Sequence, residues 1–493
     1  MVETRDGDEI DLLDSSIRTG GGAIVSTTLY VLTGVVYAAV TSPAATGTYF
    51  FAAIGIALLL RPVRGLSQTL HKIGSEPGED AAAYLGVTVL FTVAYLSIGG
   101  LVTGLALDAL TARTVLEPGL LVPAALLAVS TAVSVVTDSL FGAVGYPSYQ
   151  TWLNAGQSAL RLGVLLALNP FVSTAGDIML VVAAARGVTL LPVLILLGVR
   201  PRLPTRHHIR RAWDFAKWSV PDQILDRFSY NMPTLVLGIV ATPAAVGVYE
   251  AADRFADLGA TISWRLSAPL LSKVSGDAAS GESTFAYLDG AITGGTGVTV
   301  IVFGYLLGAH NVVAQIAFAD VPTVFSTTVL LVGGVNVLRG FWTLLSHAIE
   351  GANRPDLSFL TKVVGLAIAT PIPAVFGAKY GAVAGAAGYV VMNLAIFVVV
   401  AYYSRTTFGR VPRDTQLVVR LTLTFVAAAL ATVATTQFLS RVGVGLTSIA
   451  ISAALVCLIV FVGVLTALSP QTRRTVQRAY GLGTQWVKAT LEP

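Results

Sequence analysis

Long apolar runs, separated by short polar or Pro/Gly-rich breaks, follow one another along almost the whole chain. A run of about 20 apolar residues spans a bilayer as an α-helix, because a helix closes its backbone hydrogen bonds within the segment. We therefore predict an all-α polytopic membrane protein with about fourteen transmembrane helices. The expected spans are residues 19–41, 48–70, 82–107, 118–141, 147–168, 176–199, 215–240, 243–270, 284–308, 322–347, 355–377, 381–403, 416–438 and 444–468.

The composition supports this prediction. Of the 493 residues, 54% are hydrophobic and 12% are charged, and the mean hydropathy is +0.75. Soluble domains carry about 25% charged residues. The segments between the predicted spans are too short to fold as domains of their own. The one cysteine, Cys457, lies inside the last apolar run, so we expect neither a disulfide framework nor a cysteine-based metal site.

The cations are distributed unevenly about the predicted spans. If the N-terminus is inside, twenty Lys and Arg residues fall in cytoplasmic segments and three, Arg113, Lys379 and Arg441, fall in external ones. This bias predicts that both termini are cytoplasmic. The formal net charge of +4 then reflects membrane orientation and contact with membrane lipids, and we expect no nucleic acid as a partner.

A short motif occurs twice. Pro43 to Tyr49 reads Pro-Ala-Ala-Thr-Gly-Thr-Tyr, and Pro243 to Tyr249 reads Pro-Ala-Ala-Val-Gly-Val-Tyr, each opening an even-numbered span. A weaker Gly-Ala pair precedes both Pro147 and Pro355. Both offsets cover six spans, and a unit with an even number of spans keeps its membrane orientation when it repeats. The repeat predicts two lobes related by an axis along the bilayer normal, with the substrate site between them.

These features divide the chain into six expected parts. They are an acidic cytoplasmic tail at 1–18, an N-lobe of six helices at 19–199, a basic inter-lobe linker at 200–214, a C-lobe of six helices at 215–403, a C-terminal helix pair at 404–468 and a basic cytoplasmic tail at 469–493.

The chain resembles the multidrug/oligosaccharidyl-lipid/polysaccharide (MOP) flippase superfamily, and within it the polysaccharide-export branch that includes the O-antigen flippases. The stretch Val246 to Arg254 looks like the family's Val-Gly-x-Tyr-x-x-Ala pattern, and Pro269 to Ser272 looks like its Pro-x-Leu-Ser ending. The resemblance implies a transporter and not an enzyme. The implied activity is to flip a polyprenyl- or dolichyl-(pyro)phosphate-linked glycan across the cytoplasmic membrane by alternating access, with glycosyltransferases or a polymerase of the same pathway as partners.

Three predicted spans carry polar residues on one helical face, the spans at 147–168, 243–270 and 322–347. A charged side chain at the bilayer centre costs about 2.5–3.5 kcal/mol, so such residues usually face a cavity or a partner. Arginine offers a planar fork that binds phosphate through two hydrogen bonds, and amides suit sugar hydroxyls. The expected substrate-binding residues are Arg161, Arg254, Arg265, Arg339, Asn154, Gln157 and Asn336.

The same residues also admit a structural interpretation, in which Arg254 pairs with Glu250 one turn earlier and the charges stabilise lobe packing.

A separate group of carboxylates suggests ion coupling, because clustered buried carboxylates could couple transport to Na⁺ or H⁺. The candidates are Asp222, Asp226, Asp253 and Asp257.

Two other functions stay open at this point. A cation-coupled multidrug or small-molecule exporter of the same superfamily would favour a mainly acidic chamber, whereas four arginines lie within these spans. A membrane-embedded glycosyltransferase or polymerase would need a sizeable external loop, and the predicted external loops are short. The sequence contains no Gly-x4-Gly-Lys-Ser/Thr, His-Glu-x-x-His or Gly-x-Ser-x-Gly motif, so we expect no ATP-driven or hydrolytic chemistry from this chain.

Overall fold

The computed structural model describes most of the chain between residues 22 and 473. The described residues are 22, 25–30, 32–34, 36–37, 39–74, 79–144, 147–280, 285–318, 322–351, 355–411, 413–469 and 473. Within these ranges only the backbone is described at 118, 147–148, 191–197, 218–219, 222, 262–280, 285–287, 291, 322, 350–351, 355–356 and 358.

The described part of the chain consists of helices joined by turns and contains no strand, which confirms the all-α prediction. Eight of the described helices are long and apolar enough to cross a membrane, and the bent pair α2 and α3 would make a ninth span. Every predicted span after the first coincides with one helix or with two consecutive helices. The count of fourteen spans stays a prediction.

The chain forms two compact units. The first contains Met1–Arg254 and Leu366–Tyr389, and the second contains Phe255–Gly365 and Val390–Pro493. The helices within the first are α2 (Pro43–Leu59), α3 (Arg61–Gly74), α4 (Ala81–Leu105), α5 (Leu107–Arg113), α6 (Leu121–Ala143), α7 (Pro147–Ala167), α8 (Ala175–Leu197), α9 (Arg206–Val240) and α14 (Pro371–Tyr380), with 3₁₀ turns at Pro118–Leu120 and Asn169–Phe171.

The second unit contains α11 (Phe285–Ala317), α12 (Pro322–Gly351), α16 (Thr415–Val442) and α17 (Leu446–Leu468). Three helices contribute to both units, α10 (Pro243–Ser280), α13 (Pro355–Ala369) and α15 (Ala382–Phe408). The lobe boundaries expected from the repeat remain a prediction.

Prolines set the breaks inside two predicted spans. The span at 48–70 is broken between α2 and α3, which meet at 51°. Pro62 is the second residue of α3, and a proline there lacks the N–H that would continue α2 and clashes with the carbonyl four residues earlier. In the same way Pro371 begins α14 directly after the end of α13.

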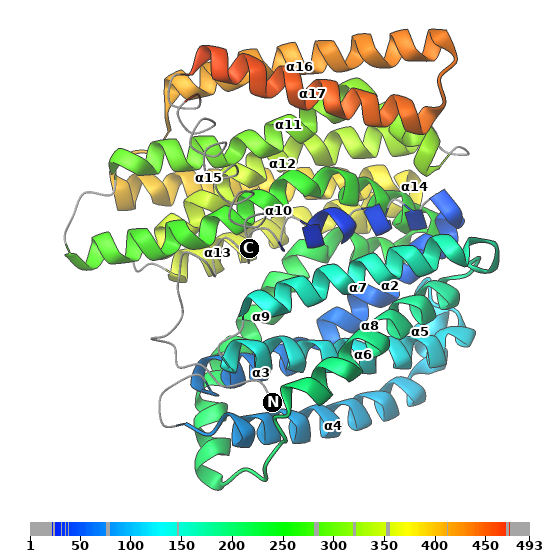
Figure 1. Ribbon diagram of the computed structural model, residues 1–493, viewed down its shortest axis with the longest axis vertical. Coiled ribbons are helices and arrows are strands. Elements are labelled where there is room, and N and C mark those ends of the chain that lie inside the picture. The colour runs from blue at the N-terminus through cyan, green and yellow to red at the C-terminus, as the bar shows by residue number, and fades with distance from the viewer. Residues whose placement is uncertain are drawn as a thin grey trace, which may run out of the picture. The chain divides into compact units, whose positions relative to one another are not determined.

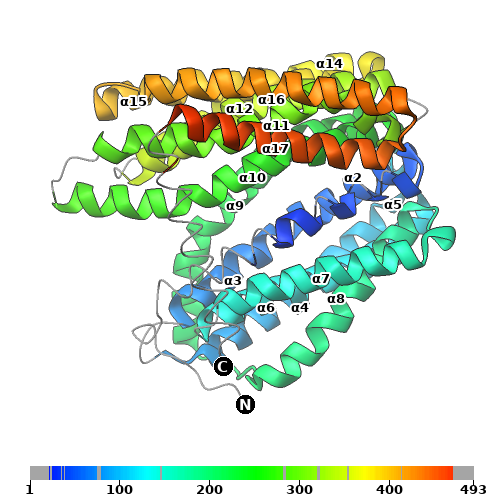
Figure 2. The ribbon, with the colours of Figure 1, turned by 45° about the horizontal axis from the view of Figure 1, so that its top comes forward.

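In the first unit α3 packs against α6 and α9, and α6 packs against α8 (Figures 1 and 2). The helix α2 lies against α6, α8 and α9, so its middle turns are surrounded by helices of the same unit. Among its buried residues are Tyr49, Phe50 and Ile54. This arrangement brings side chains of α2, α6, α8 and α9 to one place.

The repeated motif forms the same local structure twice. Ser42 precedes α2 and its hydroxyl accepts a hydrogen bond from the Ala45 amide at 3.1 Å, while the hydroxyl of Thr242 accepts from the Ala245 amide at 3.3 Å before α10. Each helix then begins with the proline of the motif, which suits the first turn because its missing N–H would have no partner there.

The two copies of the motif also touch one another. A Cβ added to Gly47 would lie 1.8 Å from the carbonyl oxygen of Pro243, and a Cβ added to Gly247 would lie 2.0 Å from that of Pro43. Each copy thus presents its glycine to the proline of the other, as two segments related by a two-fold axis do. Only glycine permits this approach of backbone to backbone.

In the second unit the C-terminal helices α16 and α17 run side by side and pack against α11 (Figures 1 and 2). Gly308 of α11 allows a close contact with Thr432 and Val433 of α16. Cys457 of α17 is buried, with its Sγ 3.7 Å from the carbonyl oxygen of Ile301. Cys457 therefore has the packing role that its place in an apolar run suggested.

An arginine-lined cavity as the candidate functional site

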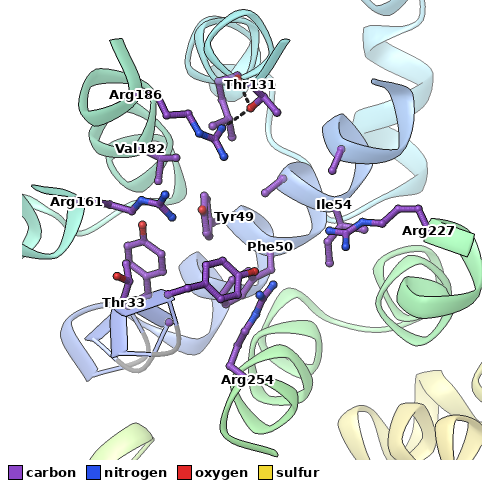
Figure 3. A pocket seen from close by; sticks show the side chains of 16 residues that line it. Thr33, Tyr49, Phe50, Ile54, Thr131, Arg161, Val182, Arg186, Arg227 and Arg254 are labelled. Atoms are coloured by element: carbon purple, nitrogen blue, oxygen red, sulfur yellow. Dashed lines mark hydrogen bonds between the residues drawn. The ribbon is translucent and has the colours of Figure 1, made fainter. Parts of the chain in front are cut away.

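A cavity of about 120 Å³ lies inside the first unit, midway along α2. Four arginines from four different helices line it (Figure 3): Arg161 of α7, Arg186 of α8, Arg227 of α9 and Arg254 of α10. The aromatic side chains in its wall are Tyr30, Tyr37, Tyr49 and Phe50. None of the sixteen residues that line the cavity is acidic.

Arg161 and Arg186 lie on one side of the cavity, with their guanidinium groups beside Tyr49 (Figure 3). The Arg161 side chain is buried and its Nε has no hydrogen-bond partner, while its charge acts on the Tyr37 hydroxyl. Arg186 donates a hydrogen bond to the hydroxyl of Thr131 on α6. The two guanidinium groups are close enough to repel one another electrostatically.

Arg254 lies on the other side, over two aromatic rings. Its guanidinium carbon is 4.6 Å from the ring centre of Tyr30 and 5.0 Å from that of Phe50, within the range of a cation–π interaction. One turn earlier on α10, Glu250 is buried and accepts a hydrogen bond from Nη2 of Arg254 at 3.3 Å. The structure thus contains the Arg254–Glu250 pair that the structural interpretation expected, at the edge of a cavity.

The cavity carries an excess of positive charge. Among the described residues, Arg161, Arg186 and Arg227 form no ion pair with a carboxylate, and the Nε of Arg227 has no hydrogen-bond partner. Two carboxylates close to the cavity arginines are Glu250, which pairs with Arg254, and Asp138, which interacts electrostatically with Arg64 and Arg186. Because an unpaired charge is costly inside a membrane protein, this arrangement favours an anionic ligand.

A second ion pair, half-buried, belongs to the other unit. Nη1 of Arg339 on α12 lies 2.6 Å from Oδ1 of Asp257 on α10, and Thr261 donates to the other carboxylate oxygen at 2.9 Å. Asn336 is buried one turn before Arg339. The Asp257 carboxylate is therefore paired with the Arg339 side chain of the same chain.

Of the remaining predicted site residues, Asn154 and Gln157 lie on α7 with Arg161 but do not line the cavity, and Asn154 lies beside Asp138. Asp253 is buried in α10, and Asp226 is exposed on α9. The side chains of Arg265 and Asp222 fall outside the described residues. The assignment of these residues to substrate or coupling ion remains a prediction.

Two arginines of the cavity were not among the predicted site residues. Arg186 is the only charged residue between Asp177 and Arg200, so an isolated arginine in a long apolar span was the signal that could have identified it. Arg227 lies in a span whose polar residues are spread around the helix, so helical periodicity assigned it to no polar face.

Comparison with known proteins shows solved structures with a similar fold. The structure is similar to that of the lipid II flippase MurJ in an inward closed conformation, with a TM-score of 0.73 over 94% of this chain and 100% of that one, at 13% identity. An inward-facing multidrug resistance MATE transporter of the MOP superfamily is similar over 78% of this chain and 94% of its own, with a TM-score of 0.64 and 16% identity. The chain has the fold of the MOP superfamily. No family model matches the sequence.

One curated protein matches in sequence, the probable low-salt glycan biosynthesis flippase Agl15 of Haloferax volcanii, at 21% identity over 207 residues. The match covers 42% of this chain and 44% of that protein, so it spans less than half of either. The proteins with the MOP fold named here and the matching curated protein are flippases and transporters and not enzymes, in agreement with the predicted class.

Proposed function

We propose that this chain flips a lipid-linked oligosaccharide or polysaccharide across the cytoplasmic membrane, and that its arginine cavity binds the phosphate or diphosphate that joins glycan to lipid. The observation that carries the proposal is the convergence of Arg161, Arg186, Arg227 and Arg254 on one cavity without an acidic residue in its wall. The glycan-flippase description of the Haloferax relative and the MurJ-like fold support the same substrate class.

The chemistry of the cavity suits a phosphate ester. Guanidinium groups form short, charge-assisted and often bidentate hydrogen bonds with phosphate oxygens, each worth about 1.5–3 kcal/mol. A cavity of about 150 Å³ holds a molecule of the size of benzene. The observed volume of about 120 Å³ therefore suits the linking phosphate group, and the glycan and the lipid would lie outside the cavity.

The alternating-access mechanism follows from the predicted repeat, with the cavity open first to the cytoplasmic leaflet and then to the external one. Polyprenyl and dolichyl carriers both present a phosphate ester at the head of a long apolar tail. The four arginines would hold this ester while the tail stays in the lipid. The protein would then recognise the phosphate link that these substrates share, and not the sequence of the glycan.

The fold is shared with multidrug MATE transporters, so an exporter of small molecules is the alternative. A cationic drug placed in this cavity would meet four arginines and no lining carboxylate, and like charges at close range repel. The cavity therefore favours the flippase over an exporter of cations.

Binding by the purified full-length protein tests the proposal. A short-chain prenyl diphosphate N-acetylglucosamine is the probe, and a lipophilic cation of similar size is the comparison. We expect saturable binding of the diphosphate sugar, weakened by added inorganic diphosphate, and no binding of the cation. Saturable binding of the cation together with no binding of the diphosphate sugar would favour the exporter instead.

A further inference from the structure

A second hollow lies in the second unit, between α11 and α16, which run side by side (Figures 1 and 2). Its volume is about 420 Å³, which is in the range of sites that hold small molecules. Five residues of each helix line the hollow, and none of the ten is acidic. All ten belong to the second unit, so the hollow is separate from the arginine cavity of the first unit.

Contacts among three helices shape the hollow. A Cβ added to Gly308 of α11 would lie 2.6 Å from the Cβ of Thr432, so α11 and α16 meet closely at this point. The hydroxyl of Thr436 on α16 donates to the Gly308 carbonyl at 3.2 Å. Most of the lining residues follow this contact, toward the C-terminal ends of both helices. His310 in the wall is hydrogen-bonded to Ser326 of α12. The hollow is therefore a fixed part of the helix packing.

The lining groups suit a phosphate with hydroxyl groups beside it. Arg441 supplies one permanent cation, and Asn311 and Gln437 supply amides that point to no partner in the described part of the chain. Guanidinium forms charge-assisted hydrogen bonds with phosphate oxygens, and amides both donate to and accept from hydroxyl groups. The lining contains no carboxylate that could pair with a choline or ethanolamine cation. The lining therefore favours an anionic headgroup over a zwitterionic one.

Apolar side chains continue the same face of α16 toward its middle. At 100° per residue, Gln437 and Arg441 fall within a sector of about 60° that also contains Leu423, Val426 and Leu430. The three apolar side chains are 55%, 47% and 65% exposed. One face of α16 thus carries an exposed apolar stripe that ends at the cationic hollow.

The stripe and the hollow together match the dimensions of one lipid leaflet. In the orientation predicted from the sequence, the C-terminal end of α16 lies at the external surface, where Arg441 is one of three cations. Leu430 precedes Arg441 by three turns, or about 16 Å at a rise of about 1.5 Å per residue. Half of the hydrocarbon core of a bilayer measures about 15 Å. A phospholipid therefore fits with its headgroup in the hollow and an acyl chain along the stripe.

We propose that the hollow between α11 and α16 binds the headgroup of an anionic phospholipid from the external leaflet, with the phosphate on Arg441 and an acyl chain along Leu430 and Val426. The lipid contacts both helices and so holds α16 against α11. Its binding is independent of the proposed glycan transport, because this headgroup and the substrate phosphate occupy sites in different units.

Native mass spectrometry of the purified full-length chain tests the site by counting bound lipid molecules. The probe is phosphatidylglycerol, and phosphatidylcholine with the same acyl chains is the comparison. We expect the wild type to bind phosphatidylglycerol more tightly than phosphatidylcholine. Arg441→Gln should weaken the binding of one phosphatidylglycerol molecule about ten-fold or more, because it removes a charged hydrogen-bond donor. The matched control is Arg113→Gln, an exposed arginine on the same predicted side and outside the hollow, which should bind as the wild type does.

A second variant tests the α11 side of the hollow. Asn311→Leu keeps the approximate size of the side chain and removes its amide, and we expect binding to weaken about two- to ten-fold. The melting temperature of each variant without added lipid confirms that it is folded.

Three results would overturn the proposal. One is phosphatidylglycerol binding that is unchanged in Arg441→Gln and in Asn311→Leu, or that falls equally in Arg113→Gln. Another is equal binding of the two lipids by the wild type. The third is displacement of phosphatidylglycerol by inorganic phosphate at the same concentration, which would indicate a site for a free anion and not for a lipid.

Discussion

Arg161 brings a buried guanidinium to the cavity wall, where its Nε has no hydrogen-bond partner. A phosphate would supply that partner, so we expect Arg161→Ala to weaken binding of the diphosphate sugar about ten- to a hundred-fold, the equivalent of about 1.5–3 kcal/mol. Arg161→Lys should also weaken binding, because lysine is a point charge without the planar fork.

The matched control for Arg161 is Arg113→Lys, an exposed arginine on α5 that does not line the cavity. Binding is measured beside the melting temperature of each variant. An affinity that falls in Arg161→Lys without a fall in melting temperature indicates a ligand contact. Unchanged affinity in both Arg161 variants would remove this residue from the proposed site.

Arg254 differs from Arg161 because it has a carboxylate of its own. We expect Arg254→Ala to lower the melting temperature, because it leaves Glu250 buried without its cation. Removing both charges, in Arg254→Ala with Glu250→Ala, should restore part of the loss, and a double-mutant cycle gives the coupling between the two residues. Additive effects of the two substitutions would show that the pair contributes little to stability.

At the level of single residues, the sequence predicted that arginines would form the site, but it identified only Arg161 and Arg254 of the four that line the cavity. Arg161 and Arg254 share a helical face with other polar residues, and that periodicity made them visible. Arg186 has no charged or amide neighbour on its face, and Arg339 shares a polar face yet pairs with Asp257 in the other unit. Helical periodicity predicts which residues share one face of a helix, but it does not predict what that face packs against.

Among the helices, the crossing of α2 and α10 depends on two glycines. Gly47→Ala adds a methyl group 1.8 Å from the carbonyl oxygen of Pro243, so the helices must move apart. We expect a lower melting temperature for Gly47→Ala and for Gly247→Ala. Gly156→Ala on α7 is the control, because nothing lies within 4 Å of its added Cβ and alanine is favoured over glycine in a helix by about 1 kcal/mol.

Thermal unfolding in detergent measures these three variants. An unchanged or higher melting temperature in Gly156→Ala, with a fall in the other two, would show that the motif contact contributes to stability. A similar response in all three variants would contradict this role for the crossing.

The sequence predicted the helices better than their breaks and their contacts. Hydrophobic runs placed every span from α2 onwards on a helix, because the bilayer requires internally bonded helices of known length. Pro62 could signal a break in the second span, but the angle of 51° depends on how α3 packs against α6 and α9. The repeated motif was visible as a duplication, whereas the reciprocal contact of its two copies is a tertiary property.

At the scale of the molecule, the uneven distribution of cations predicts that both termini are cytoplasmic. Single cysteines at Thr4 and at Lys488, each in a Cys457→Ala background, should react with a membrane-impermeant maleimide only after the membrane is opened. Labelling of the two positions from opposite sides of the membrane would contradict an even number of spans.

The flippase activity itself is tested most directly in proteoliposomes. The protein is reconstituted with a fluorescent short-chain polyprenyl diphosphate oligosaccharide, and the fraction of label that an external quencher can reach is followed in time. We expect fast equilibration between the leaflets with the wild type and with Arg113→Lys, and slow equilibration with Arg161→Ala and with empty liposomes. Equilibration by the wild type at the rate of empty liposomes would contradict the proposed activity, and a wild-type rate in Arg161→Ala would contradict the role assigned to the arginine cavity.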